Sequence, residues 1–475
     1  MTTIICWIRR ELRLADNTPL YNACRRADTV IPLYILDPAL LHSARLAGPR
    51  IGWLFDGLRQ FDQDLQRLGS RLILREGSPA TVLSALVQES GAEAVYFARD
   101  YSPYAATRDH SVETALRALG VRVELFKDNV IHEASEVLTG AKQPFSVYSP
   151  FRKVWETLPK PEPFPAPARI ATPTHLSSVP IPTAAEILPE PIVLPGESRA
   201  KARLDHFLSS AVFDYDTARD QPGIDGTSVM SPYLRWGMIS ARTCYQAARD
   251  AETEAARQPD STRARQGIQR WISELVWREF YYQVLLTHPH VVRGAFRPEY
   301  DRVPWENDDS LIDAWQRGQT GYPIIDAAMH QLLTTGWMHN RTRMIVASFL
   351  CKDLLVDWRV GERFFMQRLL DGDLANNNGG WQWTAGTGTD AAPYFRVFNP
   401  TSQGERFDPD GVYIRRWLPA LRKVPNVTIH QPARLSAADQ ARYGCVIGRD
   451  YPAPLVEHAT QRDKVLTAYA AIKKA

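Results

Sequence analysis

The sequence predicts an α/β domain with a doubly wound parallel sheet of the Rossmann type, a proline-rich linker, and then a large all-helical domain. Short apolar runs alternate with helical patterns over residues 1–128. Prolines crowd residues 129–199, which show no periodicity. Amphipathic helical patterns dominate residues 200–475. A chain of 475 residues is long enough to build two or more domains, each with its own core.

Five short apolar runs are predicted to be buried parallel strands. They cover residues 3–9, 30–37, 71–77, 94–100 and 121–128. Between the second and third runs, apolar residues recur at helical spacing from Ile51 to Leu68, which predicts a helix packed on one face of the sheet. No GxGxxG turn follows the first run, so ordinary dinucleotide binding is not indicated.

The linker and the helical region follow. Residues 159–197 are dense in proline, which predicts an extended connector between the domains. Beyond residue 200, helices are predicted over the amphipathic runs at 265–286, 325–333 and 341–355.

Composition excludes several classes of protein. The five cysteines are widely spaced and form no CxxC pair, so neither a disulfide framework nor a metal site is predicted. Met1 leads directly into a strand-like run, and no stretch reaches the roughly 18 apolar residues of a membrane span, so we expect a cytoplasmic protein without membrane contact. The net charge is only +3, so any surface for nucleic acid must be a local patch.

The stretch from Asp371 to Trp383 has the most unusual composition. It reads DGDLANNNGGWQW, with two carboxylates, three amides in a row and two indoles. Such groups can surround a planar heterocycle with donors and acceptors, although a polar loop anchored by one tryptophan would also fit. The segment 336–344, GWMHNRTRM, supplies two arginines that can pair with these carboxylates; a solvated basic turn is the alternative.

Two further clusters carry chemistry. One predicted helix face combines an acid, indoles, a phenol and a cation at spacings of three or four residues: Trp271, Glu274, Trp277, Arg278 and Tyr281. This mixture suits the wall of a cavity better than a core or a solvated face, with a partly buried ion pair as the alternative. The run 227–231, TSVMS, places hydroxyl and backbone N–H groups at a predicted helix start, where they suit phosphate oxygens or an ordinary helix cap.

Several of these segments stand in an order found in one known family. They are WIRRELRLADN (7–17), SELVWREFYY (273–282), TGYPIIDAAMHQL (320–332), GWMHNRTRM (336–344), DGDLANNNGGWQW (371–383) and GTDAAPYFRVFNP (388–400). Together they resemble the photolyase/cryptochrome family of flavin photoenzymes, and most closely the bacterial class I photolyases, of the deazaflavin-type subgroup, that act on cyclobutane pyrimidine dimers.

The resemblance implies an enzyme, a deoxyribodipyrimidine photo-lyase with FAD as its cofactor. Reduced FAD excited by blue light would donate an electron to a flipped-out dimer, the cyclobutane ring would split, and the electron would return. The expected partner is UV-damaged DNA, bound by a monomer at the nucleoid without a protein partner. A cryptochrome-type photoreceptor and a (6-4) photolyase remain the alternatives.

The resemblance implies one set of flavin-binding residues: Tyr215, Thr227, Ser228, Val229, Met230, Ser231, Trp271, Arg278, Trp337, Asn340, Arg343, Asp371, Gly372, Asp373 and Asn377. Asn377 matches the position facing flavin N5, and Arg343 is expected to pair with Asp371. Asn376 departs from the family, whose members usually carry alanine or serine there.

A second implied set contacts the DNA and the dimer: Arg219, Glu274, Trp277, Arg278, Tyr281, Asn340, Arg341, Met344, Trp383 and Gln403. Glu274 would bond to the carbonyl edge of the dimer, and Trp277 would stack on it. Trp381, Trp358 and Trp305 match the family's electron-hopping chain from flavin to surface, and with Glu274 and Asn377 they form the implied catalytic set.

Two comparisons within the family refine the expectation. Asn340 and Met344 favour dimer repair, because (6-4) enzymes carry histidine at both positions, and His339 is expected to be structural. The segment after Tyr101 lacks the acid and amide of folate-binding relatives, and residues 145–155, FSVYSPFRKVW, resemble the deazaflavin subgroup. The expected antenna is therefore 8-hydroxydeazaflavin in preference to methenyltetrahydrofolate, with a second flavin or no antenna left open.

Overall fold

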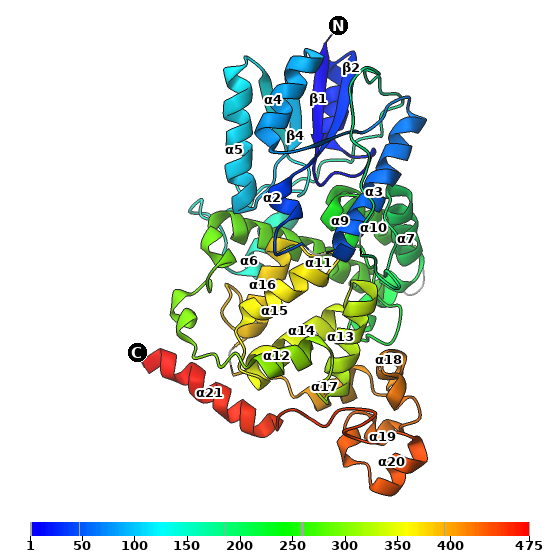
Figure 1. Cartoon of the computed structure of the whole chain (residues 1–475), viewed down its shortest axis with the longest axis vertical. Coiled ribbons are helices and arrows are strands. Elements are labelled where there is room, and N and C mark those ends of the chain that lie inside the picture. Colours follow the sequence, from blue (N-terminus) through cyan, green and yellow to red (C-terminus); the bar gives the residue numbers. More distant parts are fainter. Residues whose placement is uncertain (1, 47, 185, 258–260, 394, 475) are drawn as a thin grey trace.

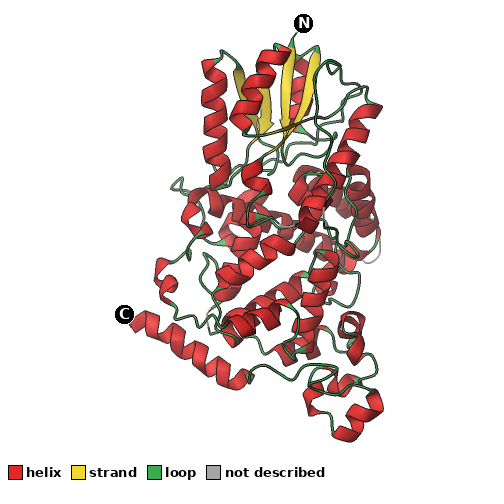
Figure 2. Ribbon diagram, in the orientation of Figure 1, coloured by secondary structure: helices red, strands yellow, loops and turns green. Residues whose placement is uncertain are grey.

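The computed structural model describes residues 2–46, 48–184, 186–257, 261–393 and 395–474. The parallel sheet occupies one end of an elongated molecule, and helices make up the remainder, with the C-terminal helix at the opposite end (Figure 1). Outside the sheet, the regular structure is helical throughout the described residues (Figure 2). None of the described helices is both long enough and apolar enough to cross a membrane.

The sheet confirms all five predicted strands. They are β1 (Thr3–Ile8), β2 (Thr29–Leu36), β3 (Ile73–Glu76), β4 (Ala94–Ala98) and β5 (Arg122–Phe126). All pairs are parallel, in the order β3-β2-β1-β4-β5. The order reverses between β1 and β4, which is the edge where open sheets of this kind bind ligands.

Helices cover both faces of the sheet. The short α2 (Pro38–Leu41) follows β2; the longer helices are α1 (Thr18–Arg26), α3 (Gly48–Arg67), α4 (Pro79–Ser90) and α5 (Pro103–Ala118). Because alternate side chains of a strand point to opposite faces, Ile4 joins a core cluster with Leu58 of α3, while Ile5 joins another with Leu116 of α5. The predicted doubly wound arrangement is therefore confirmed.

The linker differs from its prediction in one respect. Residues 158–196 contain neither helix nor strand among those described, as expected of an extended connector. Earlier in the linker, however, α6 (Tyr148–Thr157) is a helix that packs on the helical domain. Its buried side chains, Tyr148, Phe151 and Trp155, recur at helical spacing, but prolines on both sides obscure this pattern in the sequence.

The helical domain is built around α11. Its helices are α7 (Glu197–Ser209), α8 (Tyr215–Ala218), α9 (Ser231–Trp236), α10 (Ala241–Ala255), α11 (Ser261–Thr287), α12 (Asp309–Gln316), α13 (Pro323–Thr335), α14 (Asn340–Ser348), α15 (Trp358–Arg368), α16 (Leu374–Ala385), α17 (Pro400–Phe407), α18 (Val412–Trp417), α19 (Asn426–Ile429), α20 (Ala437–Tyr443) and α21 (His458–Lys474). Short 3₁₀ turns η1 (Ala211–Asp214), η2 (Pro289–Val292), η3 (Pro298–Arg302), η5 (Pro419–Leu421) and η6 (Pro432–Arg434) connect them.

One predicted helix is interrupted. The run 341–355 is α-helical only to Ser348, and it continues as the π-helical turn η4 (Phe349–Asp353). Leu355 then adopts a left-handed conformation with φ of 50°, which ends the element before α15. Sequence periodicity does not distinguish a π turn from an α-helix, because the apolar spacing hardly changes over five residues.

Buried ionic contacts join the two domains. Arg13, which follows β1, bonds to Asp128 at 2.6 Å and to the carbonyl of Gly237 at 3.0 Å. Arg242 of α10 reaches back to Asp16 at 3.0 Å. The sequence alone leaves Arg9, Arg10 and Arg13 equally compatible with surface and interdomain positions. The structure assigns Arg13 to the domain interface, because its partners lie on both sides.

Candidate functional site

A cavity of about 460 Å³ lies in the helical domain. Its walls come from α11, α14, α15 and α16 together with the turn before α9. Its volume falls within the range of roughly 300–1,000 Å³ that is usual for cofactor sites. The structure therefore brings together segments that lie far apart in the sequence.

Most residues singled out in the sequence line this cavity: Tyr215, Arg219, Thr227, Ser228, Val229, Met230, Ser231, Trp271, Glu274, Trp277, Arg278, Tyr281, Trp337, Asn340, Arg343, Met344, Asp371, Asp373, Asn377, Trp381 and Trp383. Three that were expected to contact flavin or DNA lie outside its lining: Gly372, Arg341 and Gln403.

Each of these three has another environment. The carbonyl of Gly372 accepts hydrogen bonds from the guanidinium groups of Arg50 and Arg235. Arg341 forms an ion pair with Asp220 at 2.6 Å. Gln403 is half-buried on α17. The geometry therefore disfavours direct contact between Gly372 and a ligand in this cavity.

The turn at 227–231 is held in a strained shape beside α11. Val229 has a φ of 53°, which is rare for a β-branched residue and tends to be found at functional sites. The Trp271 indole donates to the Ser228 hydroxyl at 3.1 Å, and Arg203 donates to the carbonyls of Thr227 and Ser228. These bonds fix the turn, so that its hydroxyl and N–H groups are arranged before a ligand arrives.

Two carboxylates also belong to the lining, each with a basic partner. Arg343 bonds to Asp371 at 2.8 Å, as the sequence led us to expect. Asp373 caps α16 and accepts from Arg10 of the sheet domain at 2.7 Å and from the Tyr282 hydroxyl at 2.6 Å. Burial alone would raise the pKa of Asp373, but Arg10, Arg235 and Tyr282 hold that pKa well below its usual range. The carboxylate is therefore ionised at neutral pH.

Two buried polar atoms in this region have no hydrogen-bond partner among the described residues. Within the described part of the chain, neither Asp371 Oδ1 nor Arg235 Nη1 makes a hydrogen bond, and both residues line the cavity. Burial lowers the pKa of Arg235 to about 10, so the guanidinium still carries its charge at neutral pH. Unpaired buried atoms of this kind are costly, so they fit a polar ligand that supplies both an acceptor and a donor.

Arg10 and Arg235 were both missed by the sequence analysis as site residues. Arg235 lies four positions after the TSVMS run, and its place on α9 is the one signal that points to it. Arg10 belongs to the sheet domain, and nothing local indicates that it reaches the cavity.

The neighbouring amides Asn376 and Asn377 both line the cavity but have different roles in the structure. Asn377 donates its amide N–H to the carbonyl of Glu362 at 2.9 Å, which leaves its own carbonyl oxygen for a ligand donor. Asn376 donates to Asp373 Oδ1 at 2.9 Å, within the cap of α16. The departure at Asn376 therefore strengthens the helix cap rather than adding a second amide towards the ligand.

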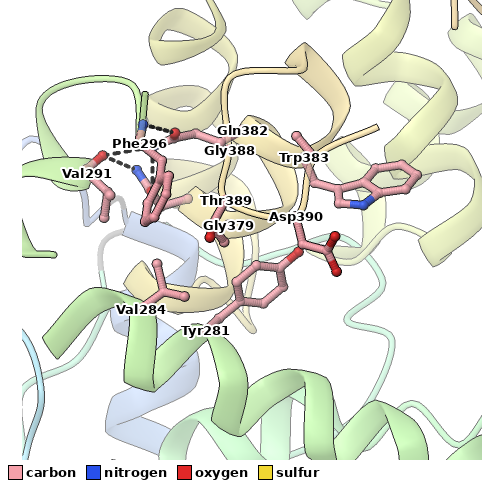
Figure 3. A pocket seen from close by; sticks show the side chains of 12 residues that line it. Tyr281, Val284, Val291, Phe296, Gly379, Gln382, Trp383, Gly388, Thr389 and Asp390 are labelled. Carbon is pink, nitrogen blue, oxygen red and sulfur yellow. Dashed lines mark hydrogen bonds between the residues drawn. The ribbon is translucent and has the colours of Figure 1, made fainter. Parts of the chain in front are cut away.

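Aromatic rings and an acid form another part of the lining. Trp277 and Tyr281 come from α11, and Trp383 comes from α16. Tyr281 and Trp383 also border a small hollow next to the cavity (Figure 3). Glu274 is held by an ion pair with Arg219. Flat rings beside a carboxylate suit a planar, polar group such as a nucleobase.

Two of the three tryptophans expected to carry electrons are buried, and the third is half-buried. Trp381 lines the cavity and packs on the backbone of Gly361, while Trp358 is buried at the start of α15. Trp305 is half-buried and packs against the hydrophobic cluster that contains Trp358 and Trp381. Trp305 and Trp358 do not line the cavity, as a chain leading away from it requires.

Comparisons with known proteins agree with this geometry. The family profile described as the FAD binding domain of DNA photolyase matches residues 271–471, and the DNA photolyase profile matches residues 4–168. The chain is 42% identical to the deoxyribodipyrimidine photo-lyase of Synechococcus sp., over 99% of this chain and 97% of that protein. It is 39% identical to that of Escherichia coli, with both chains covered completely.

Solved structures show the same fold. The class III photolyase of Agrobacterium tumefaciens superimposes with a TM-score of 0.91 at 37% identity, covering 100% of this chain and 98% of the other. A photolyase of Sulfolobus tokodaii that contains two FAD molecules gives 0.83 at 30% identity, over 99% and 100% of the two chains. A cryptochrome of Synechocystis gives 0.90 at 29% identity, over 98% and 99%. By sequence and by structure, along nearly its whole length, this chain belongs to the photolyase/cryptochrome family.

Proposed function

We propose that this protein is a deoxyribodipyrimidine photo-lyase, which uses light and FAD to repair cyclobutane pyrimidine dimers in DNA. The observation that carries the proposal is one cavity that combines arginine-paired carboxylates, buried polar atoms without a hydrogen-bond partner and an aromatic, acidic wall. Such a lining suits a flavin together with two linked pyrimidines of one DNA strand. The full-length similarity to deoxyribodipyrimidine photo-lyases supports the same reaction.

The cavity residues fit FAD in two regions. Tyr215 and the fixed turn at 227–231 would hold the diphosphate through hydroxyl and backbone N–H groups. Asp371, Arg235 and Asn377 would hold the ring system, because all three line the cavity and the first two each carry a buried polar atom without a hydrogen-bond partner among the described residues. When bound and reduced, FAD supplies one electron to the dimer on absorbing blue light and regains it after the ring has opened.

The dimer reaches this site only if it leaves the DNA duplex, because a base inside the stack cannot approach a buried cofactor. Trp277 and Trp383 would receive its faces, and Glu274 would accept a hydrogen bond from its polar edge. Asn340 and Met344 complete this part of the lining. Glu274 is paired with Arg219 in the structure, so we expect Arg219 to turn towards a DNA phosphate when the dimer takes its place.

The strand on either side of the dimer would be held by Arg219, Arg341 and Gln403. Arg341 and Gln403 lie outside the cavity, where a contact to the DNA backbone must lie. Neutralised phosphates release counterions, so binding should weaken steeply as the salt concentration rises. We also propose that the protein acts at the chromosome, as a monomer.

Trp381, Trp358 and Trp305 would carry an electron inwards to reduce oxidised flavin. Trp381 lines the cavity and Trp305 is half-buried at a position outside it, which supports this role. Indoles are among the more readily oxidised side chains, and they lie in or against one hydrophobic cluster.

The sheet domain would hold an antenna, and we propose 8-hydroxydeazaflavin in preference to methenyltetrahydrofolate. Charged and aromatic groups gather beyond the carboxyl ends of β1, β2 and β4, where open sheets bind ligands. Arg108 lies over the Trp7 ring at 5.0 Å, and the Tyr104 hydroxyl bonds to Asp37.

The test of the antenna adds each chromophore to the FAD-loaded protein and measures repair under light that this chromophore alone absorbs. A response to the folate alone would overturn this preference.

The reaction itself is tested with an oligonucleotide that carries one thymine dimer. Enzyme with prereduced FAD should restore intact thymines in blue light and leave the dimer unchanged in the dark. A second oligonucleotide with a (6-4) photoproduct serves as the comparison. Tight FAD binding without repair of either lesion would favour a photoreceptor, and repair of the second lesion alone would favour a (6-4) photolyase.

A further inference from the structure

Tyr148, at the start of α6, stacks on Trp277 of the cavity. The two ring centroids lie 3.5 Å apart and the planes differ by only 7°, so Tyr148 covers one entire face of the indole. Tyr148 is buried, although its neighbours Val147 and Ser149 are exposed. Trp277 nevertheless lines the cavity, so its other face is the one available to a ligand.

Two hydrogen bonds fix the position of Tyr148. Its hydroxyl donates to the carbonyl of Ser273 at 2.9 Å, one turn before Trp277 on α11. Its backbone N–H donates to the carboxylate of Asp390 at 3.0 Å. The α6 start has no side-chain cap of its own, so Asp390 supplies the acceptor that this helix end needs.

The segment that contains Asp390 leads back to the second aromatic wall. Residues 388–392 fold against the end of α16, where the N–H of Ala392 donates to the carbonyl of Trp383 at 3.1 Å. Thr389 adds a bond to the carbonyl of Ser146 at 2.6 Å. Trp383, Thr389 and Asp390 border the same small hollow (Figure 3). A continuous set of contacts therefore runs from Trp383 through Asp390 and Tyr148 to Trp277.

We propose that Tyr148 is a positioning residue for dimer recognition: stacked on Trp277 and anchored by Asp390, it fixes the spacing and orientation of the two aromatic walls that receive the dimer. This inference rests on the proposed function, because it assigns a role within the dimer site.

The physical reason is the freedom that an unsupported indole has. A ring packed on one side can rotate about its side-chain torsions, and binding a flat ligand on its exposed face must then restrict that motion. Stacked aromatic pairs contribute about 0.5–1.5 kcal/mol beyond the area they bury. Removing this support should therefore weaken dimer binding without touching the phosphate contacts or the flavin residues.

The test compares variants of the full-length, FAD-loaded protein in the dark. Tyr148→Leu removes the ring, Tyr148→Phe keeps the ring without its hydroxyl, and Asp390→Ala removes the anchor. Tyr21→Leu is the matched control, because Tyr21 stacks on Phe164 at 4.4 Å in a contact that is not part of the cavity lining. For each protein, affinity is measured for the oligonucleotide with one thymine dimer and for its undamaged counterpart, together with the FAD content.

Tyr148→Leu should weaken binding of the dimer oligonucleotide by about three- to tenfold, with unchanged affinity for undamaged DNA and unchanged FAD content. Tyr21→Leu should retain the preference of the parent protein. Tyr148→Phe keeps the stacked ring and should lose clearly less than Tyr148→Leu, and Asp390→Ala should lose part of the preference. If Tyr148→Leu with full FAD content keeps the parent's preference, the inference is wrong. It is equally wrong if Tyr148→Phe loses as much as Tyr148→Leu.

If the leucine variant loses FAD, Asp390→Ala decides the question, since it leaves the stacked rings in place: a retained preference overturns the inference. A parent protein that binds both oligonucleotides equally contradicts the proposed function itself. Failure of the positioning role is a different result, because it can be observed only when the parent protein binds the dimer oligonucleotide more tightly than the undamaged one.

Discussion

Glu274 shows how one residue can have two successive partners. It lines the cavity and is paired with Arg219, and both side chains are partly exposed. An ion pair that is partly solvated costs little to break, so exchange of Arg219 for a dimer is energetically feasible. The pair thus keeps the acid oriented until substrate replaces the arginine.

We predict that Glu274→Ala lowers dimer repair by roughly tenfold and leaves FAD bound, because a hydrogen bond to a charged group contributes about 1.5–3 kcal/mol. Glu274→Gln, which keeps the shape of the side chain, should lose less. Repair yield and the flavin absorbance are measured on the same samples. Loss of FAD from Glu274→Ala would show that the residue belongs to the flavin site instead.

His339 is a second residue whose environment decides its chemistry. It is buried, and its ring nitrogen caps α14 by accepting from the N–H of Arg341 at 3.2 Å. Burial lowers the pKa of His339 to about 3, so the folded protein holds a neutral imidazole. The expectation of a structural histidine agrees with this position.

This shift predicts a pH dependence of stability. Between about pH 6.5 and pH 3 the imidazole of His339 binds a proton in the unfolded chain but not in the folded protein. The stability that the neutral imidazole contributes is therefore fully present above pH 6.5, and it is lost as the pH falls. His339→Asn retains a cap and cannot titrate. From pH 7.5 to pH 5.5 the parent's unfolding free energy should therefore fall by roughly 1 kcal/mol more than the variant's. Equal losses in urea titrations of the two proteins would contradict the assignment.

At the scale of elements, irregular backbone surrounds the proposed electron-transfer chain. The π turn η4 and the left-handed Leu355 lie just before Trp358, and the carbonyl of Leu355 accepts from the N–H of Glu306, next to Trp305. A π turn shifts the residues after it relative to a regular α-helix, and such turns are frequent at functional sites. The irregular stretch therefore fixes where Trp358 and Trp305 stand.

We predict that Trp305→Phe slows photoreduction of oxidised FAD several-fold and leaves repair by chemically reduced enzyme unchanged, because phenylalanine is much harder to oxidise than tryptophan. Trp417→Phe is the control, since Trp417 packs against the same cluster from α18. Flavin absorbance under illumination with an external reductant measures the rate. Equal rates in the Trp305 variant and the parent would remove Trp305 from the chain.

At the scale of the whole molecule, the two domains meet through backbone as well as charge. Gly237 ends α9 in a left-handed conformation with φ of 63°, and a Cβ at this position would lie 1.6 Å from the carbonyl oxygen of Arg10. The neighbouring carbonyl of Trp236 accepts from the N–H of Leu12 at 3.2 Å. This close approach sets where Arg10 meets Asp373, so the sheet domain holds one of the carboxylates that line the cavity.

We predict that Gly237→Ala destabilises the protein far more than Gly444→Ala. Both glycines cap helices with similar positive φ, but a Cβ at Gly444 meets no atom within 4 Å. The control should therefore lose only about 1 kcal/mol for left-handed strain, while Gly237→Ala must also separate the domains. Thermal unfolding and FAD retention are measured for both. Similar losses in the two variants would mean that the interface at Arg10 tolerates displacement.

Apolar periodicity and composition within short stretches are enough to predict the five strands, the helical runs at 51–68, 265–286 and 325–333, and the polar 371–383 segment. Only the tertiary structure placed Arg10 against Asp373, 363 positions away, and Tyr148 against Trp277. Arg235, whose Nη1 makes no hydrogen bond within the described residues, likewise gained its role from the fold. Local patterns encode which face of an element is buried, but contacts between distant segments depend on how the whole chain packs, and no local rule contains that information.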